Sequence, residues 1–325
     1  MAAAAVVGND SLQTLGTFLS SNRGRTPLPA QMAFLLGLTA VVLGLGWWLN
    51  GGDPAWGRLA QFPLPDAIGW IDLLPPLAVL LLTRWGAPVS TSVLLLTAIA
   101  PANAGPVLLR SLIGYGLAFA TALLLYGAVL WLLERPLLDA QHSGEPEPEL
   151  TGVAAAGLEP GDAADAPRWL VLQWLSTAWL WSQWLVHDLA NIFILLPRQL
   201  QAWQLGLSAA ALGGGLCALV AWGGGPIQRM VQDKVNTSHL RSATLIDLLF
   251  GALLLALARF SPTPLSTTWV FLGLLAGREL GLLLRLRHRP ALEVGAVLVG
   301  DLGKASLALA LSLAVALLIQ PLKAL

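Results

Sequence analysis

Two short hydroxyl-rich motifs interrupt an otherwise apolar sequence, Pro-Val-Ser-Thr-Ser at residues 88–92 and Pro-Leu-Ser-Thr-Thr at residues 264–268. In each, a proline, which breaks helices, comes shortly before side chains that cap helix starts. A helix that starts inside an apolar bundle exposes free backbone N–H groups and the positive end of its dipole, and both attract anions. A single motif of this kind would be interpreted as a simple helix cap next to a loop. Two matched copies instead favour an anion site.

A second pair of motifs places an aspartate about 80 residues before each Ser-Thr pair. These are Gly-Asn-Asp-Ser-Leu-Gln at residues 8–13 and Val-His-Asp-Leu-Ala-Asn at residues 186–191. A carboxylate within a membrane bundle is costly unless it is paired or coordinated, so Asp10 and Asp188 are functional candidates. Next to an amide such as Asn191, they suit a hard monovalent cation or a proton. For Asp10, a solvated N-terminal acid is the alternative interpretation.

The elements that must position these residues are membrane-spanning helices. Of the 325 residues, 56% are hydrophobic and 11% are charged, whereas soluble domains carry about a quarter charged residues. Spanning the hydrocarbon takes about 20 helical residues. Uncharged windows of about that length are Met32 to Leu49, Ser111 to Leu133, Trp169 to Val186, Leu205 to Trp222 and Ala305 to Leu322. These runs lack a period of two, so we expect an all-α integral membrane protein.

Composition argues against several other classes of protein. The formal net charge of zero disfavours nucleic acid as a partner. The single cysteine, Cys217, excludes an internal disulfide and a thiolate cluster. The sequence has no metal-ligand cluster, phosphate-binding glycine loop or nucleophile-base set. We therefore expect no enzyme activity, no cofactor and no metal beyond a sodium ion at Asp10 and Asp188.

The two halves of the chain resemble each other. Residues 70–92 align with residues 245–268 with one insertion, so that Asp72 matches Asp247 and Arg84 matches Arg259. We expect an N-terminal transmembrane repeat at residues 1–133, an acidic linker rich in Pro, Gly and Ala at 134–168, and a C-terminal transmembrane repeat at 169–325. The expected architecture is two inverted-topology repeats with broken or hairpin helices near the bilayer midplane. Asp72 and Asp247 are either interfacial helix caps or part of an ion path.

Basic residues predict the orientation in the membrane. They cluster in two segments, at Arg229, Lys234 and Arg241 and at Arg285, Arg287 and Arg289. The positive-inside rule places both segments in the cytoplasm and leaves the acidic linker free to lie outside. The chain between the segments must then turn back within the membrane, near Pro262 and Pro264. The N-terminal stretch lacks a basic start and a long apolar core, so we expect no removable secretion signal. The expected location is a bacterial inner (plasma) membrane.

At these motifs the sequence resembles the inorganic phosphate transporter family, whose repeated signatures read approximately G-A-N-D-V-A-N-A and P-x-S-T-T-H. Asn9 and Asp10 match the first signature, and Asp188 and Asn191 match its second copy, with His187 in place of the first Asn. The Ser-Thr signature is matched at residues 88–92 and more fully at residues 264–268. Val93 and Trp269 stand where the family has a histidine.

The resemblance implies an ion-coupled symporter of inorganic phosphate or a similar oxyanion such as sulfate, coupled to sodium or protons and working by alternating access. It implies that the motifs of both halves meet near the bilayer midplane. The residues implicated in substrate binding are Asn9, Ser90, Thr91, Asn191, Ser266, Thr267 and Thr268, and those for the coupling ion are Asp10 and Asp188. A non-transporting relative that serves as a scaffold or accessory subunit is the main alternative, and a channel is a weaker one. A homo-oligomer is left open.

Overall fold

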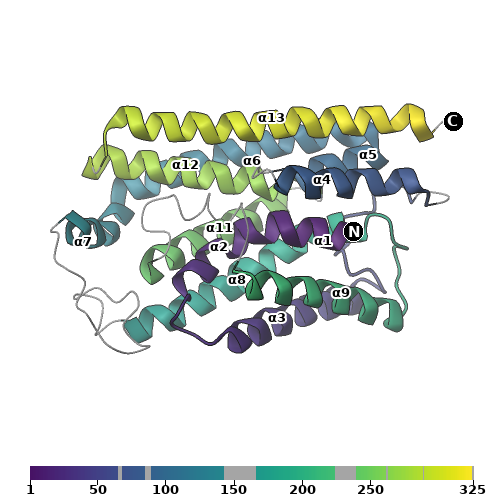
Figure 1. Cartoon of the computed structure of the whole chain (residues 1–325), viewed down its shortest axis with the longest axis horizontal. Helices are drawn as coiled ribbons and strands as arrows, with labels where there is room; N and C mark the ends of the chain where they lie inside the picture. Colours follow the sequence, from purple (N-terminus) through teal and green to yellow (C-terminus); the bar gives the residue numbers. More distant parts are fainter. Residues whose placement is uncertain are drawn as a thin grey trace.

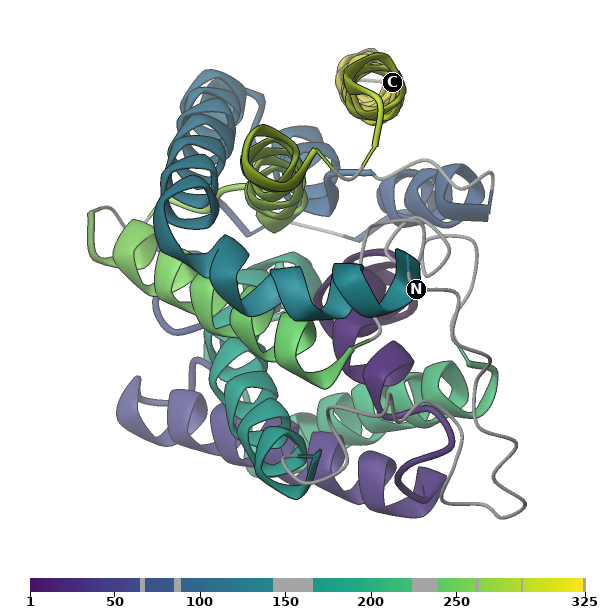
Figure 2. The same cartoon turned by 90° about the vertical axis from the view of Figure 1, so that its left-hand side faces the viewer.

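The computed structural model describes residues 1–64, 68–84, 89–142, 166–223, 239–260, 263–287 and 289–323. These residues form helices and turns, with no strand among them, which confirms the predicted all-α fold class. Long helices make up most of the molecule, and the last two in the chain run along its longest axis, whereas others cross it obliquely (Figures 1 and 2). The long helices are α3 (Leu28–Leu49), α6 (Ala104–Leu125), α8 (Ala166–Phe193), α9 (Ala202–Ala221), α11 (Leu240–Phe260), α12 (Thr267–Leu286) and α13 (Ala291–Lys323).

Among the described residues, five helical segments are long and apolar enough to cross a membrane, with mean hydropathies between 1.6 and 2.1. They are Leu28–Leu49, Pro101–Pro136, Ala202–Ala221, Leu240–Phe260 and Ala291–Ile319. Large apolar side chains such as Leu124, Trp222 and Leu292 lie exposed on these segments or at their ends, as expected of surfaces that face lipid. The chain is an integral membrane protein. The predicted span at Trp169 to Val186 lies within α8, which has 28 residues and is not among the five.

The N-terminal segment lies in the middle of the bundle. It consists of α1 (Ala2–Val6), a π-helical turn η1 (Val7–Ser11) and α2 (Leu12–Ser21). Figures 1 and 2 show it between a layer formed by α6, α12 and α13 and a layer formed by α3 and α9. This segment contacts α4, α8, α9 and α11. The first aspartate motif is therefore enclosed by elements from both halves of the sequence.

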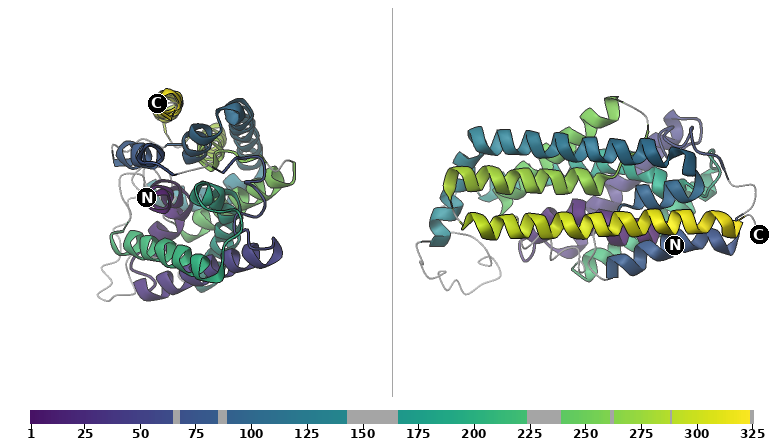
Figure 3. Two further views of the ribbon diagram at one scale, coloured as in Figure 1. Left: turned by 90° about the vertical axis from the view of Figure 1, so that its right-hand side faces the viewer. Right: turned by 90° about the horizontal axis from the view of Figure 1, so that it is seen from above.

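Each Ser-Thr motif lies where the chain reverses direction. In the first half, α4 (Leu74–Arg84) is followed by the π-helical turn η3 (Ser92–Leu96) and α5 (Thr97–Ile99). In the second half, α11 is followed by α12, which begins partway along α13 (Figures 1 and 3). Pro88 and Pro262 lie outside the described residues. The duplication and its inverted topology remain predictions.

A row of glycines brings α12 close to α6. Gly273, Gly277 and Gly281 recur every four residues and therefore share one face of α12. A Cβ atom added at Gly273 would meet the carbonyl oxygen of Tyr115, and one added at Gly277 would meet that of Phe119. Small residues at this spacing let two membrane helices approach to backbone contact. This seam joins α6 and α12, which lie side by side in Figure 3.

We expect Gly277→Ala to destabilise the protein, because the new methyl group must displace the backbone of α6. Overpacking of this kind costs about 1–3 kcal/mol. The measurement is thermal unfolding of the full chain in detergent, followed by tryptophan fluorescence. Gly116→Ala on α6 is the matched control, because a Cβ there meets nothing within 4 Å. Equal unfolding temperatures for the two variants would contradict the close approach.

The expected linker at residues 134–168 overlaps two helices. Helix α7 (Trp131–His142) covers its first residues, α8 begins at Ala166, and residues 143–165 lie outside the described residues. The acidic and proline-rich composition of this segment predicted a linker, yet Glu134 and Pro136 belong to a helix. The helix ends that flank residues 143–165 lie at the same end of the molecule as the α12–α13 turn with its basic residues (Figure 1). Both attachment points therefore lie on the side predicted to be cytoplasmic, which disagrees with a linker that lies outside.

Glu134 takes part in a buried ion-pair network. Arg278 Nη2 lies 2.8 Å from Glu134 Oε1, and Arg278 Nη1 lies 3.1 Å from Glu279 Oε1. Ser242 Oγ donates to Glu134 Oε2 over 2.6 Å, and the Arg278 guanidinium lies 5.3 Å from the centre of the Tyr126 ring. These contacts join α7, α11 and α12 at the end of the bundle near the expected linker.

Candidate functional site

Asp10 lies at the centre of a buried polar cluster. Its side chain is 1% exposed, so the alternative interpretation of a solvated N-terminal acid is wrong. Asn9 Nδ2 donates to Asp10 Oδ1 and to the carbonyl oxygen of Val89, both over 2.6 Å. Thr91 Oγ1 donates to Asp10 Oδ2, and Thr268 Oγ1 lies 3.3 Å from Asp10 Oδ1. Asp10 therefore contacts the Ser-Thr motifs of both halves.

Asp188 and Asn191 extend this cluster from α8. They lie three residues apart on one face of the helix, and Asn191 Nδ2 donates to Asp188 Oδ1 over 2.7 Å. The same amide lies 2.9 Å from Ser92 Oγ and 3.2 Å from Thr91 Oγ1. The hydroxyl of Thr267 lies close to Asp188. Asp188 Oδ2 and Asn191 Oδ1 have no hydrogen-bond partner among the described residues.

The first serine of each motif, Ser90 or Ser266, acts as a helix cap. Ser266 Oγ accepts from the backbone N–H of Trp269 over 3.4 Å, and Ser90 Oγ accepts from that of Val93 over 3.2 Å. The backbone N–H of Ser266 donates to Ser111 Oγ on α6 over 2.9 Å. In both motifs, therefore, the serine caps the helical turn and the threonine after it lies beside a carboxylate.

All nine residues predicted for the site are buried. Seven of them meet in one cluster through their side chains: Asn9, Asp10, Thr91, Asp188, Asn191, Thr267 and Thr268. Ser90 and Ser266 lie next to it in the chain and position it. Ser92, which contacts Asn191, was not among the predicted binding residues although it follows Thr91 directly.

The cluster combines two carboxylates with few positive charges. Asp10 and Asp188 act on each other electrostatically, and Arg58 is the basic residue whose charge acts on Asp188. Two like charges in a medium of low dielectric repel strongly. Carboxylate, amide and hydroxyl oxygens are ligands that hard cations prefer, whereas the capped start of α12 suits an anion. The arrangement can therefore hold a cation and an anion side by side.

Asp247 lies in a separate buried network. Its side chain accepts hydrogen bonds from Thr17 Oγ1 and Thr177 Oγ1, each over 2.7 Å, and from Gln173 Nε2 over 3.0 Å. Gln173 Oε1 in turn accepts from Thr244 Oγ1 over 3.0 Å. Asp247 is fully buried within α11, so the interpretation as an interfacial cap is wrong for this residue.

Asp72, the residue matched to Asp247 in the alignment of the halves, has a different setting. It lies in a 3₁₀ turn (Trp70–Leu73) just before α4, where its Oδ2 accepts from the backbone N–H of Gly69 over 2.9 Å. Capping is therefore confirmed for Asp72. The two matched aspartates share a place in the sequence pattern and differ in their surroundings.

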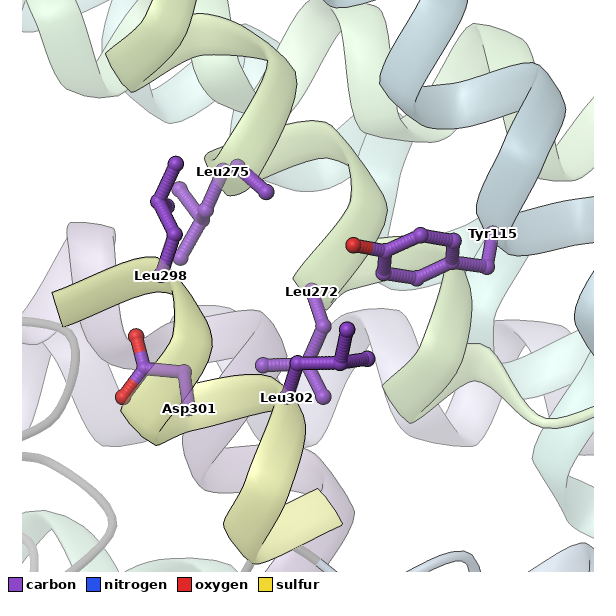
Figure 4. Close-up of a pocket in the computed structure, with 7 residues that line it drawn as sticks. Tyr115, Leu272, Leu275, Leu298, Asp301 and Leu302 are labelled. Carbon is purple, nitrogen blue, oxygen red and sulfur yellow. The ribbon is translucent and has the colours of Figure 1, made fainter. Parts of the chain in front are cut away.

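A pocket between α12 and α13 lies away from the cluster. Figure 4 shows the Tyr115 ring and the side chains of two helices around it, with Asp301 at one side. It is lined by Tyr115, Leu272, Leu275, Ala276, Leu298, Asp301 and Leu302. None of these is a predicted site residue, and the lining is mostly apolar. The polar cluster remains the candidate site.

Comparisons with known proteins place the fold. No family model matches the sequence, and no curated protein matches it. A solved structure described as "The sodium-dependent phosphate transporter" matches with a TM-score of 0.55 and 16% sequence identity. The match covers 98% of this chain and 96% of the other. At this identity the likeness shows that the two proteins share a fold.

Proposed function

We propose that the chain is an ion-coupled symporter that carries inorganic phosphate or a similar oxyanion by alternating access. The observation that carries the proposal is the meeting of four motifs, separated by up to 258 residues, in one buried polar cluster. The motifs supply carboxylates and capped helix starts, which are complementary to a cation and an anion. The structurally similar protein is described as a sodium-dependent phosphate transporter, and this agrees with the proposal.

The two carboxylates explain why transport would be coupled. A pair of unit charges 4 Å apart interacts by about 4 kcal/mol at an effective dielectric constant of 20. An anion beside an uncompensated Asp10 or Asp188 therefore binds about a thousandfold more weakly than beside a neutralised one. A sodium ion or a proton at these carboxylates removes the penalty. Cation and oxyanion then favour each other's binding, as linkage requires.

The threonines supply the anion ligands. Thr91, Thr267 and Thr268 each carry a hydroxyl that can donate to a carboxylate or to a bound oxyanion. When a cation neutralises the carboxylates, the hydroxyl hydrogens are free to turn towards the anion. The backbone N–H groups at the start of α12 add further donors. Substrate and coupling ion would thus share the same hydroxyl groups.

Uptake by the purified full chain in liposomes tests the proposal. We expect labelled phosphate to accumulate above equilibrium under an inward sodium gradient or an inward proton gradient. Unlabelled sulfate as a competitor tests the choice of oxyanion. Flux without a coupling ion indicates a channel. Absence of gradient-driven uptake of both phosphate and sulfate, together with a stoichiometric partner on native purification, supports the scaffold instead.

Thr268→Val is expected to lower gradient-driven uptake about tenfold or more, because it removes the hydroxyl beside Asp10 and the Val89 carbonyl and leaves Asn9 Nδ2 as the donor that these two groups share. Valine keeps the shape of threonine, so the protein should still fold. Ser312→Ala is the control, since it removes a buried hydroxyl that bonds only to its own helix, at the carbonyl oxygen of Ala308. Similar uptake by the two variants at equal protein content would count against a role for Thr268.

A further inference from the structure

Arg58 is a buried cation outside the motifs. Its side chain is 7% exposed, and its Nη1 has no hydrogen-bond partner among the described residues. It is carried by the turn segment that follows α3, whose apolar side chains Ala55, Leu59 and Phe62 pack into the main core. Burying a guanidinium group without acceptors is costly. A ligand that brings oxygen atoms would satisfy it.

Arg110 and His187 also have side-chain nitrogen atoms without a hydrogen-bond partner among the described residues. Arg110 on α6 donates from Nη2 to the carbonyl oxygen of Leu257 over 3.1 Å, while its Nε has no partner among the residues that the structure describes. His187 Nε2 donates to the carbonyl oxygen of Leu254 over 2.9 Å, while its Nδ1 likewise has no partner there. The charges of Arg58 and Arg110 act on each other and on His187. Arg58 and Arg110 are therefore close enough for their charges to interact, whereas His187, whose Nε2 proton bonds to Leu254, offers its Nδ1 as an acceptor only.

The region around Arg58 adjoins the candidate site, but the carboxylates of that site do not neutralise its positive charge. Asp188 is the acidic residue whose charge acts on Arg58. No ion pair within 4.0 Å joins Arg58 to Asp188, although both residues are described. The charge of Arg110 also acts on Arg58, so an anion that binds between the two guanidinium groups relieves the repulsion between them. A guanidinium group presents its N–H donors in a planar fork that matches two oxygens of a tetrahedral oxyanion.

Hydrogen bonds fix the segment of Arg58 at one end of the molecule. Leu200 N donates to the carbonyl oxygen of Gly52 over 2.8 Å, and Asn103 Nδ2 donates to that of Gln61 over 3.2 Å. Arg198 Nη2 donates to the carbonyl oxygen of Phe62 over 3.1 Å. This end, where α3 ends and α9 begins, lies opposite the α12–α13 turn with its basic residues (Figure 1). By the positive-inside rule it faces away from the cytoplasm.

We propose that Arg58 and Arg110 form a second oxyanion subsite, which takes up the substrate between the non-cytoplasmic end and the Asp188 cluster. The inference rests on the proposed function and adds two binding residues to it. The subsite concentrates a phosphate or sulfate ion next to the cation site and raises the rate of encounter. Transfer from Arg58 to the threonines then requires the coupling ion, whereas capture at Arg58 does not.

Kinetics of the reconstituted full chain separate this role from that of a counter-ion for Asp188. We expect Arg58→Met to raise the KM for phosphate about tenfold or more, as loss of hydrogen bonds between charged groups implies. At saturating phosphate, the coupling-ion concentration for half-maximal uptake should stay the same or fall, because loss of the Arg58 charge favours a cation at Asp188. Arg58→Lys keeps the charge and loses the fork, so its KM should be intermediate. Arg84→Met, at an exposed arginine of α4, should match the wild type.

An unchanged KM in Arg58→Met overturns the subsite, and so does a variant that alters only the coupling-ion dependence. Binding gives a second readout that does not require transport. Phosphate without sodium should raise the unfolding temperature of the detergent-purified wild type, and the rise should be lost in Arg58→Met. If the wild type binds phosphate in this way and shows no uptake, the proposed function fails and the subsite stands. If phosphate does not stabilise the wild type, the subsite is overturned.

Discussion

Asp188→Asn should abolish gradient-driven phosphate uptake by the reconstituted protein. The substitution keeps the shape of the side chain and removes its charge. Loss of one unit charge at 4 Å weakens cation binding by about 4 kcal/mol, or about a thousandfold. Asn191 can still donate to the new side-chain oxygen, so the fold should persist. The measurement is labelled phosphate uptake under a sodium gradient and, separately, under a proton gradient.

Asp72→Asn is the matched control for this prediction. Asp72 accepts from the backbone N–H of Gly69 in the 3₁₀ turn before α4, and an asparagine side chain has an oxygen that can accept the same hydrogen bond. Uptake by Asp72→Asn should therefore stay close to that of the wild type. Coupled uptake by Asp188→Asn at the wild-type rate would remove Asp188 from the mechanism and would favour Asp10 as the lone carboxylate for the coupling ion.

Arg278→Met should destabilise the folded protein by about 3–5 kcal/mol, because Glu134 and Glu279 would keep their places in the bundle without the cation between them. Thermal unfolding of the full chain in detergent measures the loss. The double variant Glu134→Gln with Arg278→Met should recover part of it, since the second change removes a buried charge. Arg285→Met on the same helix is the control, because Arg285 is exposed and bonds through Nε to the carbonyl oxygen of Gly127. Equal unfolding temperatures for the two single variants would show that the buried network adds little.

Local patterns predicted the fold class and most of the helices. Hydropathy is summed along the chain, so windows such as Met32 to Leu49 identify α3 without knowledge of its neighbours. The boundary of the linker was harder to predict, because Glu134 has the composition of a solvent-exposed segment. Its burial depends on Arg278, which lies 144 residues away in the sequence. Burial of a charge by a distant partner leaves no local signal.

The candidate site was partly predictable for a similar reason. Repeated motifs identified seven residues that meet, because two copies of an unusual polar pattern are informative even when each copy alone is not. The motifs did not distinguish the capping serines from the threonines that face the carboxylates. Arg58 belongs to no motif, and its charge acts on Asp188 only when the segment after α3 folds against the core. Likewise, the sequence around Asp10 shows no pattern that predicts its π-helical turn.

The glycine seam on α12 determines which neighbour holds each arm of the α11–α12 hairpin. Because Gly273 and Gly277 bring α12 into backbone contact with α6, while α11 packs chiefly against α8, the two arms are held by different helices. Under the proposed alternating access, a displacement of α12 with α6 relative to α8 would carry Thr267 and Thr268 away from Asp188. The contact between Thr268 and Asp10 would then be broken. Occupancy of the polar cluster would in this way affect how closely α12 lies to the N-terminal segment.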